Sequence, residues 1–279
     1  MQKRKGLLRG TWYPDTKEEC EMFISSGTKH IKIDKKIFGG IVPHAGWYFS
    51  GETAKIIIEA LSHMNPDLVI VFGMHMAEGE KIRIMTNGAY ETPVGDLFVC
   101  TDLVKEIEKD TDFIPETPDD FIPDNTIEVQ LPFIRHFMGE VEVFCCGLPP
   151  DESSFEFGRK VGKKALELGK KPVVIGSTDL THYGPSYGFM PYGKSSEAYE
   201  KVKNFNDKKM ISLIENMDYS GIISDSRVNM NACCSGAAAG AVGCALSLGA
   251  KKGVCADYSN SCEKRKSDSF VGYAGIYFE

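Results

Sequence analysis

Short apolar runs alternate with longer stretches of helical periodicity along most of this chain. The apolar runs have the length and the bounding turn residues of buried strands. They predict strands at residues 39–43, 67–73, 81–85, 96–100, 141–148, 172–176, 253–259 and 270–278. The periodic stretches predict helices at residues 19–25, 53–63, 103–109, 126–138, 155–168, 196–216 and 235–248. We expect Asp15 with Glu18 to cap the first helix and Ser50 to cap the second.

The alternation of strands and helices predicts an α/β protein with a mixed, largely parallel sheet between two layers of helices. We expect a single three-layer αβα domain over residues 1–279, because no low-complexity linker or fixed-period repeat divides the chain. The strongest candidate for a boundary is the proline-rich stretch 114–123, whose acidic character fits a surface loop equally well. The small residues of the helix at 235–248 suit close packing on the sheet.

Three of the six histidines closely follow predicted strands. His44 and His75 come just after two of the apolar runs, and His182 follows a third within a few residues. In an open α/β sheet the carboxyl ends of the strands meet at one edge, where ligands bind. The sequence therefore predicts a metal or proton-transfer centre built from distant segments. Each histidine alone is also consistent with a loop residue or a buried residue bonded to a carbonyl.

Carboxylates accompany these histidines in the sequence. Asp179 lies three residues before His182, so on a helical turn the two side chains would share a face. The carboxylate would then fix the imidazole tautomer and raise its basicity. The alternative is that Asp179 only caps a short helix. Glu128 offers a further carboxylate for the same cleft, although a solvated helix residue explains it as well.

The cysteines predict reduced thiols rather than a disulfide framework, because the chain has nine of them, no export signal and no CxxC pair. Cys233 and Cys234 directly precede the predicted helix at 235–248, and a helix N-terminus stabilises a thiolate. Neighbouring side chains on a strand point to opposite faces, so we expect at most one thiol of this pair to face a given site. Cysteines that only pack in the core are the alternative.

Composition narrows the classes of partner. A net charge of −7 gives no general attraction to nucleic acid or to an anionic membrane surface. No apolar stretch approaches the roughly 18–20 residues that span a bilayer. With the reduced thiols, this predicts a cytoplasmic protein with no nucleic-acid or membrane partner. The chain also lacks a G-x-S-x-G elbow, a P-loop and a G-x-G-x-x-G motif, which disfavours serine hydrolase and nucleotide-binding functions.

A set of segments that are each weak signals lies in a fixed order over nearly the whole chain. They are residues 10–14, residues 43–46, the strand before His75, residues 127–133, residues 177–184, Cys233 with Gly236, and residues 268–274. Together they resemble the Memo family, also known as protein B of the AmmeMemoRadiSam system. That family is structurally similar to the class III, LigB-type extradiol dioxygenases, so the resemblance implies a LigB-dioxygenase-like α/β fold.

The resemblance also implies a metal site with two histidine ligands and one cysteine ligand, which are His44, His75 and Cys233. It implies a cleft around that site with catalytic residues His182, Asp179 and Glu128 and substrate-binding residues Trp12 and Tyr48. Imidazole and thiolate ligands suit iron or copper, with zinc as the alternative, rather than magnesium or calcium. The related dioxygenases hold iron(II) with two histidines and a carboxylate, so a cysteine in the carboxylate's place disfavours ring cleavage.

The chain departs from the family pattern in three places. Phe-Gly-Met precedes His75, Asn125 replaces a family histidine, and Cys234 replaces a family glycine, which makes Cys234 an alternative ligand to Cys233. We expect a metal-dependent redox enzyme, oxidase- or dioxygenase-like, that acts on a small aromatic molecule, with His182 as general acid or base. The alternatives are a non-catalytic adaptor that binds a peptide in a vestigial metal cleft and a zinc-dependent hydrolase. A homo-oligomer is compatible with the sequence.

Overall fold

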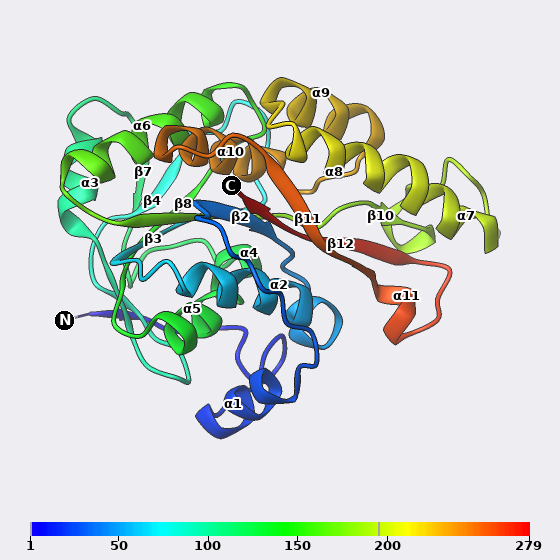
Figure 1. Ribbon diagram of the computed structural model, residues 1–279, viewed down its shortest axis with the longest axis horizontal. Helices are drawn as coiled ribbons and strands as arrows, with labels where there is room; N and C mark the ends of the chain where they lie inside the picture. The colour runs from blue at the N-terminus through cyan, green and yellow to red at the C-terminus, as the bar shows by residue number, and fades with distance from the viewer. Residues whose placement is uncertain (1, 195) are drawn as a thin grey trace.

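The computed structural model describes residues 2–194 and 196–279, and in them a mixed twelve-stranded sheet carries helices on both faces (Figure 1). The strands are β1 (Lys3–Arg4), β2 (Gly39–Val42), β3 (Leu68–Gly73), β4 (Arg83–Met85), β5 (Ala89–Tyr90), β6 (Leu97–Val99), β7 (Ile114–Glu116), β8 (Glu142–Gly147), β9 (Pro172–Ser177), β10 (His182–Tyr183), β11 (Gly253–Asn260) and β12 (Phe270–Phe278). All eight predicted strands are present, with ends shifted by at most two residues.

The helices include two short non-α segments. They are α1 (Lys17–Ser26), α2 (Trp47–Ser62), α3 (Thr101–Glu108), α4 (Asn125–Glu128), α5 (Leu131–Met138), α6 (Ser153–Glu167), the 3₁₀ turn η1 (Pro185–Tyr187), α7 (Ser196–Lys201), the π-helical segment η2 (Val202–Asp207), α8 (Lys208–Glu215), α9 (Tyr219–Asn229), α10 (Ser235–Leu248) and α11 (Ser261–Lys264). The sequence did not predict α9, which follows α8 after a short turn.

The centre of the sheet is parallel, and antiparallel pairs join it to the outer strands. The main path runs β1-β5-β6-β8-β3-β9-β2-β12-β10, and the neighbours from β6 to β2 pair in parallel. The last strand, β12, pairs antiparallel with β2, β10 and β11. This arrangement confirms the predicted α/β class and the largely parallel sheet. The parallel strands are almost fully buried, as their continuous apolar runs require.

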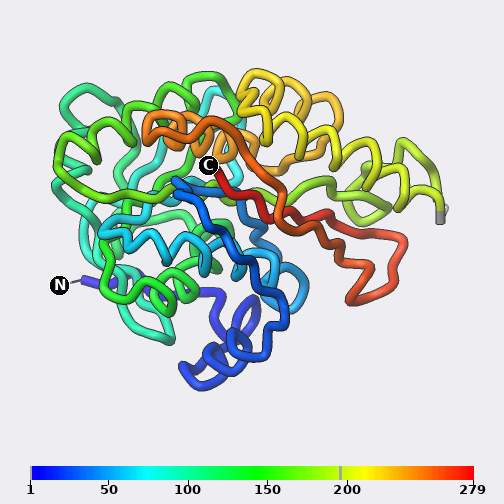
Figure 2. Tube along the Cα trace, in the orientation of Figure 1, coloured from blue at the N-terminus to red at the C-terminus, as the bar shows by residue number. Residues whose placement is uncertain are grey.

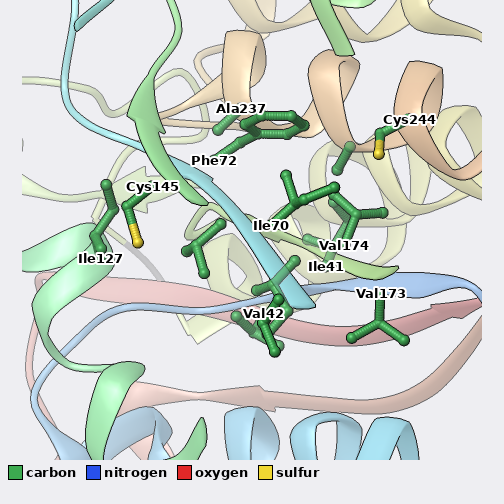
Figure 3. Close-up of a cluster of buried hydrophobic side chains, with 14 of the residues drawn as sticks. Ile41, Val42, Ile70, Phe72, Ile127, Cys145, Val173, Val174, Ala237 and Cys244 are labelled. Atoms are coloured by element: carbon green, nitrogen blue, oxygen red, sulfur yellow. The ribbon is translucent and has the colours of Figure 1, made fainter. Parts of the chain in front are cut away.

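Helices α6 and α10 cover one face of the sheet, and α2 and α5 cover the other (Figure 1). Figure 3 shows Phe72 of β3 beside Ala237 of α10, within a buried cluster that also holds Cys244. Small residues let α6 and α10 approach closely: a Cβ atom added to Gly158 would lie 2.0 Å from the carbonyl oxygen of Gly240. The predicted close packing of this helix on the sheet is confirmed at β9, where a Cβ atom added to Gly176 would lie 2.7 Å from the Ala241 Cβ.

Two helix starts differ from the prediction because other residues supply the caps. Thr16 and Glu19 form the capping box of α1, one residue beyond Asp15 and Glu18. Helix α2 begins at Trp47 with Gly46 as its N-cap, so Ser50 lies inside the helix and donates a hydrogen bond back to the Ala45 carbonyl oxygen.

Two predicted helices are each divided into shorter segments. The helix at 126–138 separates into α4 and α5, and Pro132 lies in the first turn of α5, where its missing N–H group costs nothing. The helix at 196–216 is α7, η2 and α8 in succession. Its π-helical part turns both Asn206 and Asp207 into the protein, where both side chains are buried.

Between β1 and β2, the chain passes along the outer side of the layer that contains α2 and α5, and α1 lies on this side (Figure 2). The proline-rich stretch that we considered as a boundary contains β7, which pairs with β4, and then a turn. Within residues 2–194 and 196–279, none of the helices combines the length and apolar character needed to cross a bilayer.

Candidate metal centre

The carboxyl ends of β2, β9 and β3 deliver polar side chains to one edge of the sheet. These three strands are adjacent and parallel, so Val42, Ser177 and Gly73 end at the same edge. His44 and His75 follow β2 and β3, and their ring centroids lie 5.1 Å apart. The predicted convergence of strand ends is therefore present for these two histidines.

Two cysteines complete a compact group of donor atoms. One ligand atom each of His44, His75, Cys233 and Cys234 lies within 4.8 Å of every other. The Cys233 Sγ is 3.2 Å from His44 Nε2 and 3.8 Å from Cys234 Sγ. The prediction that only one thiol of the pair faces the site is wrong, because the pair lies in the turn before α10 and not on a strand.

Hydrogen bonds fix the proton of His44 on Nδ1. The Ser177 hydroxyl donates its hydrogen to the Thr126 carbonyl oxygen at 2.7 Å. Ser177 Oγ is 3.1 Å from His44 Nδ1 and can only accept there, so His44 Nδ1 is the donor. The Nε2 atom of a neutral His44 therefore keeps a free lone pair, and this atom is the one that faces Cys233.

The same arrangement recurs at His75 with Asp124, a residue that the sequence reasoning missed. His75 Nδ1 lies 3.1 Å from Asp124 Oδ2, and a carboxylate only accepts, which leaves Nε2 free. Asp124 is also the N-cap of α4 and accepts from the Thr126 backbone N–H at 2.8 Å. An aspartate two residues before a threonine at a predicted helix start was the signal that could have identified it.

The electrostatics of the group favour a thiolate beside cationic or metal-bound imidazoles. Burial raises the pKa of Cys233. Hydrogen bonds with the Cys234 thiol and both histidines, together with the charge of His44, lower it by more, so the pKa lies well below its usual value. Burial lowers the pKa of His44, but Asp179 and Cys233 raise it overall to about 9. Hydrogen bonds with Asp124 and Cys233 raise the pKa of His75 to about 10.

His182 lies beside this group, but not on the helical turn that we considered. Residues 178–181 form a loop, and His182 begins β10. Its Nε2 is 4.0 Å from Asp179 Oδ2, while its Nδ1 is 3.2 Å from the Leu180 carbonyl oxygen, to which only a protonated Nδ1 can donate. The other oxygen of Asp179 accepts from the His44 backbone N–H at 2.7 Å, so this carboxylate joins the two histidine loops.

A cavity of about 670 Å³ opens beside these residues. His44, His75, Asp179 and His182 contribute to its wall, and Asn125 lines it while donating to the His44 carbonyl oxygen at 2.9 Å. Its aromatic wall consists of Trp12, Phe49, Tyr187 and Tyr273. The volume is in the range of pockets that hold small molecules.

Two residues assigned to the cleft from sequence lie outside this wall. Glu128 Oε1 accepts from the Leu8 backbone N–H at 2.7 Å and from the Tyr13 hydroxyl at 3.0 Å. These two hydrogen bonds hold the N-terminal segment against α4. Tyr48 is 62% exposed, and its hydroxyl donates to the Lys264 carbonyl oxygen. The structure brings together His44, His75, Cys233, Asp179, His182 and Trp12, but not Glu128 and Tyr48.

Comparison with known proteins shows the family to which this sequence belongs. A family model described as Memo-like protein matches residues 4–277. The chain belongs to the Memo family. A MEMO1 family protein of Nitrosopumilus maritimus is 31% identical over 289 residues, 99% of each chain, and the MEMO1 family protein PYRAB05390 of Pyrococcus abyssi is 32% identical over 289 residues, 98% of each chain. Among solved structures, the uncharacterized protein JW3007 of Escherichia coli K12 has 12% identity and a TM-score of 0.49 to this Memo-family chain, over 88% of this chain and 100% of that one.

The donor set of this Memo-family chain fits a transition metal. Both imidazoles present Nε2 atoms whose ring orientation is held through Nδ1, by Ser177 for His44 and by Asp124 for His75. Such partners are typical of metal-binding histidines. Imidazole nitrogen and thiolate sulfur suit iron, copper or zinc rather than magnesium or calcium. The residues present could therefore hold such an ion.

Proposed function

We propose that the chain is a metal-dependent oxidoreductase that acts on a small aromatic molecule. The observation that carries this proposal is the pair of Nδ1-anchored histidines, His44 and His75, beside Cys233 at the wall of a cavity of about 670 Å³. His44, His75 and Cys233 would hold the metal. A bound iron or copper ion would supply one-electron redox chemistry and polarise a substrate oxygen.

The cavity wall supports an aromatic substrate. Trp12, Tyr187 and Tyr273 offer ring surfaces against which a small aromatic molecule can pack. Tyr187 stands edge-on to the His182 ring, with centroids 4.9 Å apart, so a ring bound beside Tyr187 lies close to that imidazole. A hydroxyl on the substrate would then be within reach of His182.

His182 is the residue that we assign to proton transfer. Because its Nδ1 donates to the Leu180 carbonyl oxygen, Nε2 of the neutral ring is free to accept a proton from a phenolic hydroxyl. Asp179, 4.0 Å from that Nε2, stabilises the resulting imidazolium. With a dihydric phenol as substrate and dioxygen as acceptor, two electrons and two protons leave the phenol, giving a quinone and hydrogen peroxide.

Oxygen uptake with catechol tests this proposal on anaerobically purified protein whose metal content has been measured. General acid–base catalysis contributes about 10²–10⁴-fold, so we expect a loss of that order in His182→Gln with the metal content unchanged. His30→Gln is the matched control, because His30 is exposed on the surface beside Glu59. Uptake by His182→Gln at the wild-type rate would contradict the assignment.

The identity of the native metal separates the alternatives. Native zinc would favour hydrolysis, because zinc is redox-inert and can activate a water molecule at an open position. A metal-free protein that binds a peptide would favour the adaptor function. Iron or copper together with catechol-dependent oxygen uptake supports the oxidoreductase.

We also propose that residues 1–279 form one domain that functions in the cytoplasm. One buried apolar cluster extends from Tyr13 to Phe278, which supports a common core. All nine cysteines are free thiols, which suits a reducing compartment.

A further inference from the structure

We infer that Cys234 is a fourth ligand of the metal, so that this chain holds its ion with two imidazole nitrogens and two adjacent cysteine sulfurs. The inference rests on the proposed metal centre and extends it by one residue. It concerns Cys234 in addition to Cys233, not in its place.

The distance between the two sulfur atoms is the first observation that supports Cys234 as a ligand. Cys233 Sγ and Cys234 Sγ are 3.8 Å apart. A tetrahedral site with metal–sulfur bonds of about 2.3 Å places two sulfur ligands about 3.8 Å apart. The two thiols therefore already have the spacing of two corners of such a site. The four donor atoms fall within 4.8 Å of one another, so only small movements would bring all of them to one ion.

The backbone around the pair holds this spacing. The Cys233 backbone N–H donates to the Asp179 carbonyl oxygen at 3.2 Å, and the Cys234 backbone N–H donates to Thr178 Oγ1 at 3.0 Å. Two residues later, Gly236 lies so close to Pro149 that an added Cβ would meet its carbonyl oxygen at 2.1 Å. The start of α10 is thus fixed against the end of β9 and the loop after β8.

The Cys234 side chain has no competing structural task as a helix cap. Cys234 is the N-cap residue of α10, but its side chain makes no capping hydrogen bond. It is buried, and its sulfur contacts the Cys233 sulfur. The other buried cysteines, which are Cys20, Cys100, Cys145, Cys146 and Cys244, do not join the donor group.

A second thiolate changes what the centre can do. Four protein ligands fill a tetrahedral shell, so a substrate would have to bind at an added fifth position on the side of the cavity. Two soft sulfur donors also favour thiophilic ions, such as zinc, iron and copper, more strongly than one does. The metal should accordingly be held more tightly than by His44, His75 and Cys233 alone.

Cobalt(II) chloride is the probe for the test, because thiolate-to-cobalt charge-transfer absorption reports the number of bound thiolates. Metal-free full-length protein is titrated without oxygen, and the absorption is expressed per bound cobalt. We expect Cys234→Ala and Cys233→Ala each to retain about half of the wild-type intensity, and the double variant to retain none. We also expect Cys234→Ala to bind cobalt at least about tenfold more weakly. Cys255→Ala is the matched control, because its thiol lies on β11 away from the donor group.

The outcomes separate this inference from the proposed metal centre. Full wild-type intensity in Cys234→Ala, with no thiolate absorption in Cys233→Ala, overturns the fourth ligand and leaves the three-ligand centre intact. A wild-type protein that binds no cobalt overturns both. If Cys234→Ala does not fold, X-ray absorption of the cobalt-loaded wild type decides: two sulfur neighbours support the inference, and one sulfur neighbour overturns it.

Discussion

The buried carboxylate of Asp207 makes the stability of this protein depend on pH in a way that one substitution should remove. Asp207 is fully buried, and its Oδ1 accepts from the Thr181 backbone N–H at 3.1 Å and from the Thr181 hydroxyl at 2.5 Å. Its Oδ2 accepts from the Tyr258 hydroxyl at 2.8 Å. Burial raises the pKa of Asp207 from 3.8 to about 6, although the hydrogen bonds from Thr181 and Tyr258 oppose the rise.

The direction in which stability changes with pH follows from proton linkage. The folded protein keeps a proton on Asp207 that the unfolded chain has already lost, so this proton contributes stability in full below pH 3.8. The contribution declines as the pH rises and is lost above the folded pKa of about 6. At pH 5, one unit below that value, about 1.4 kcal/mol of it remains, and at pH 8 almost none remains.

Asp207→Asn has no such proton, and its amide can still accept from Thr181. The free energy of unfolding, measured with urea at pH 5 and pH 8, should shift in favour of the variant by about 1.4 kcal/mol between the two pH values, relative to wild type. Tyr258→Phe is a second probe, because it removes one hydrogen bond that lowers the pKa of Asp207 and should move the loss of stability to higher pH. Equal pH dependence in wild type and Asp207→Asn would refute the reasoning.

Three further substitutions test the packing and the support of the site. Gly158→Ala should lower the free energy of unfolding, measured with urea, by about 1–3 kcal/mol, because its Cβ would collide with the Gly240 carbonyl oxygen. Unchanged stability would contradict this close contact between α6 and α10. Asp124→Asn should weaken metal binding about 10–100-fold in a chelator competition, because His75 loses the carboxylate that orients its ring; an unchanged affinity would argue against that role. Glu128→Ala should cost about 1–3 kcal/mol in thermal or urea unfolding and leave the metal content unchanged, whereas metal loss without destabilisation would place Glu128 in the site.

The parts of the site that follow strands could be predicted from sequence, because apolar runs identify buried parallel strands. The runs before His44 and His75 marked β2 and β3, and parallel strands end at a common edge. Cys233 arrives from the turn before α10, and it was assigned as a ligand only through the family resemblance. The direction of the Cys234 side chain was predicted wrongly. Neighbouring side chains alternate between two faces on a strand, but Cys233 and Cys234 lie in a turn.

Helix boundaries were less predictable where distant residues decide them. Trp47, the first residue of α2, is held by distant residues: its indole donates to the Val129 carbonyl oxygen at 2.8 Å and its ring stacks on Phe133. The same region divides α4 from α5, where Gln130 donates to the Pro43 carbonyl oxygen at 2.8 Å. These are contacts between segments far apart in the chain, which local periodicity does not encode.

The central claim is that His44, His75 and Cys233 hold a transition metal. Elemental analysis of anaerobically purified protein tests it most directly, on the wild type, His44→Ala and Cys233→Ala, with thermal unfolding to verify that each variant is folded. We expect stoichiometric iron or copper, or zinc, in the wild type, little or none in folded His44→Ala, and a clearly reduced content in folded Cys233→Ala, which keeps the Cys234 thiol. Full metal occupancy in either variant would contradict it.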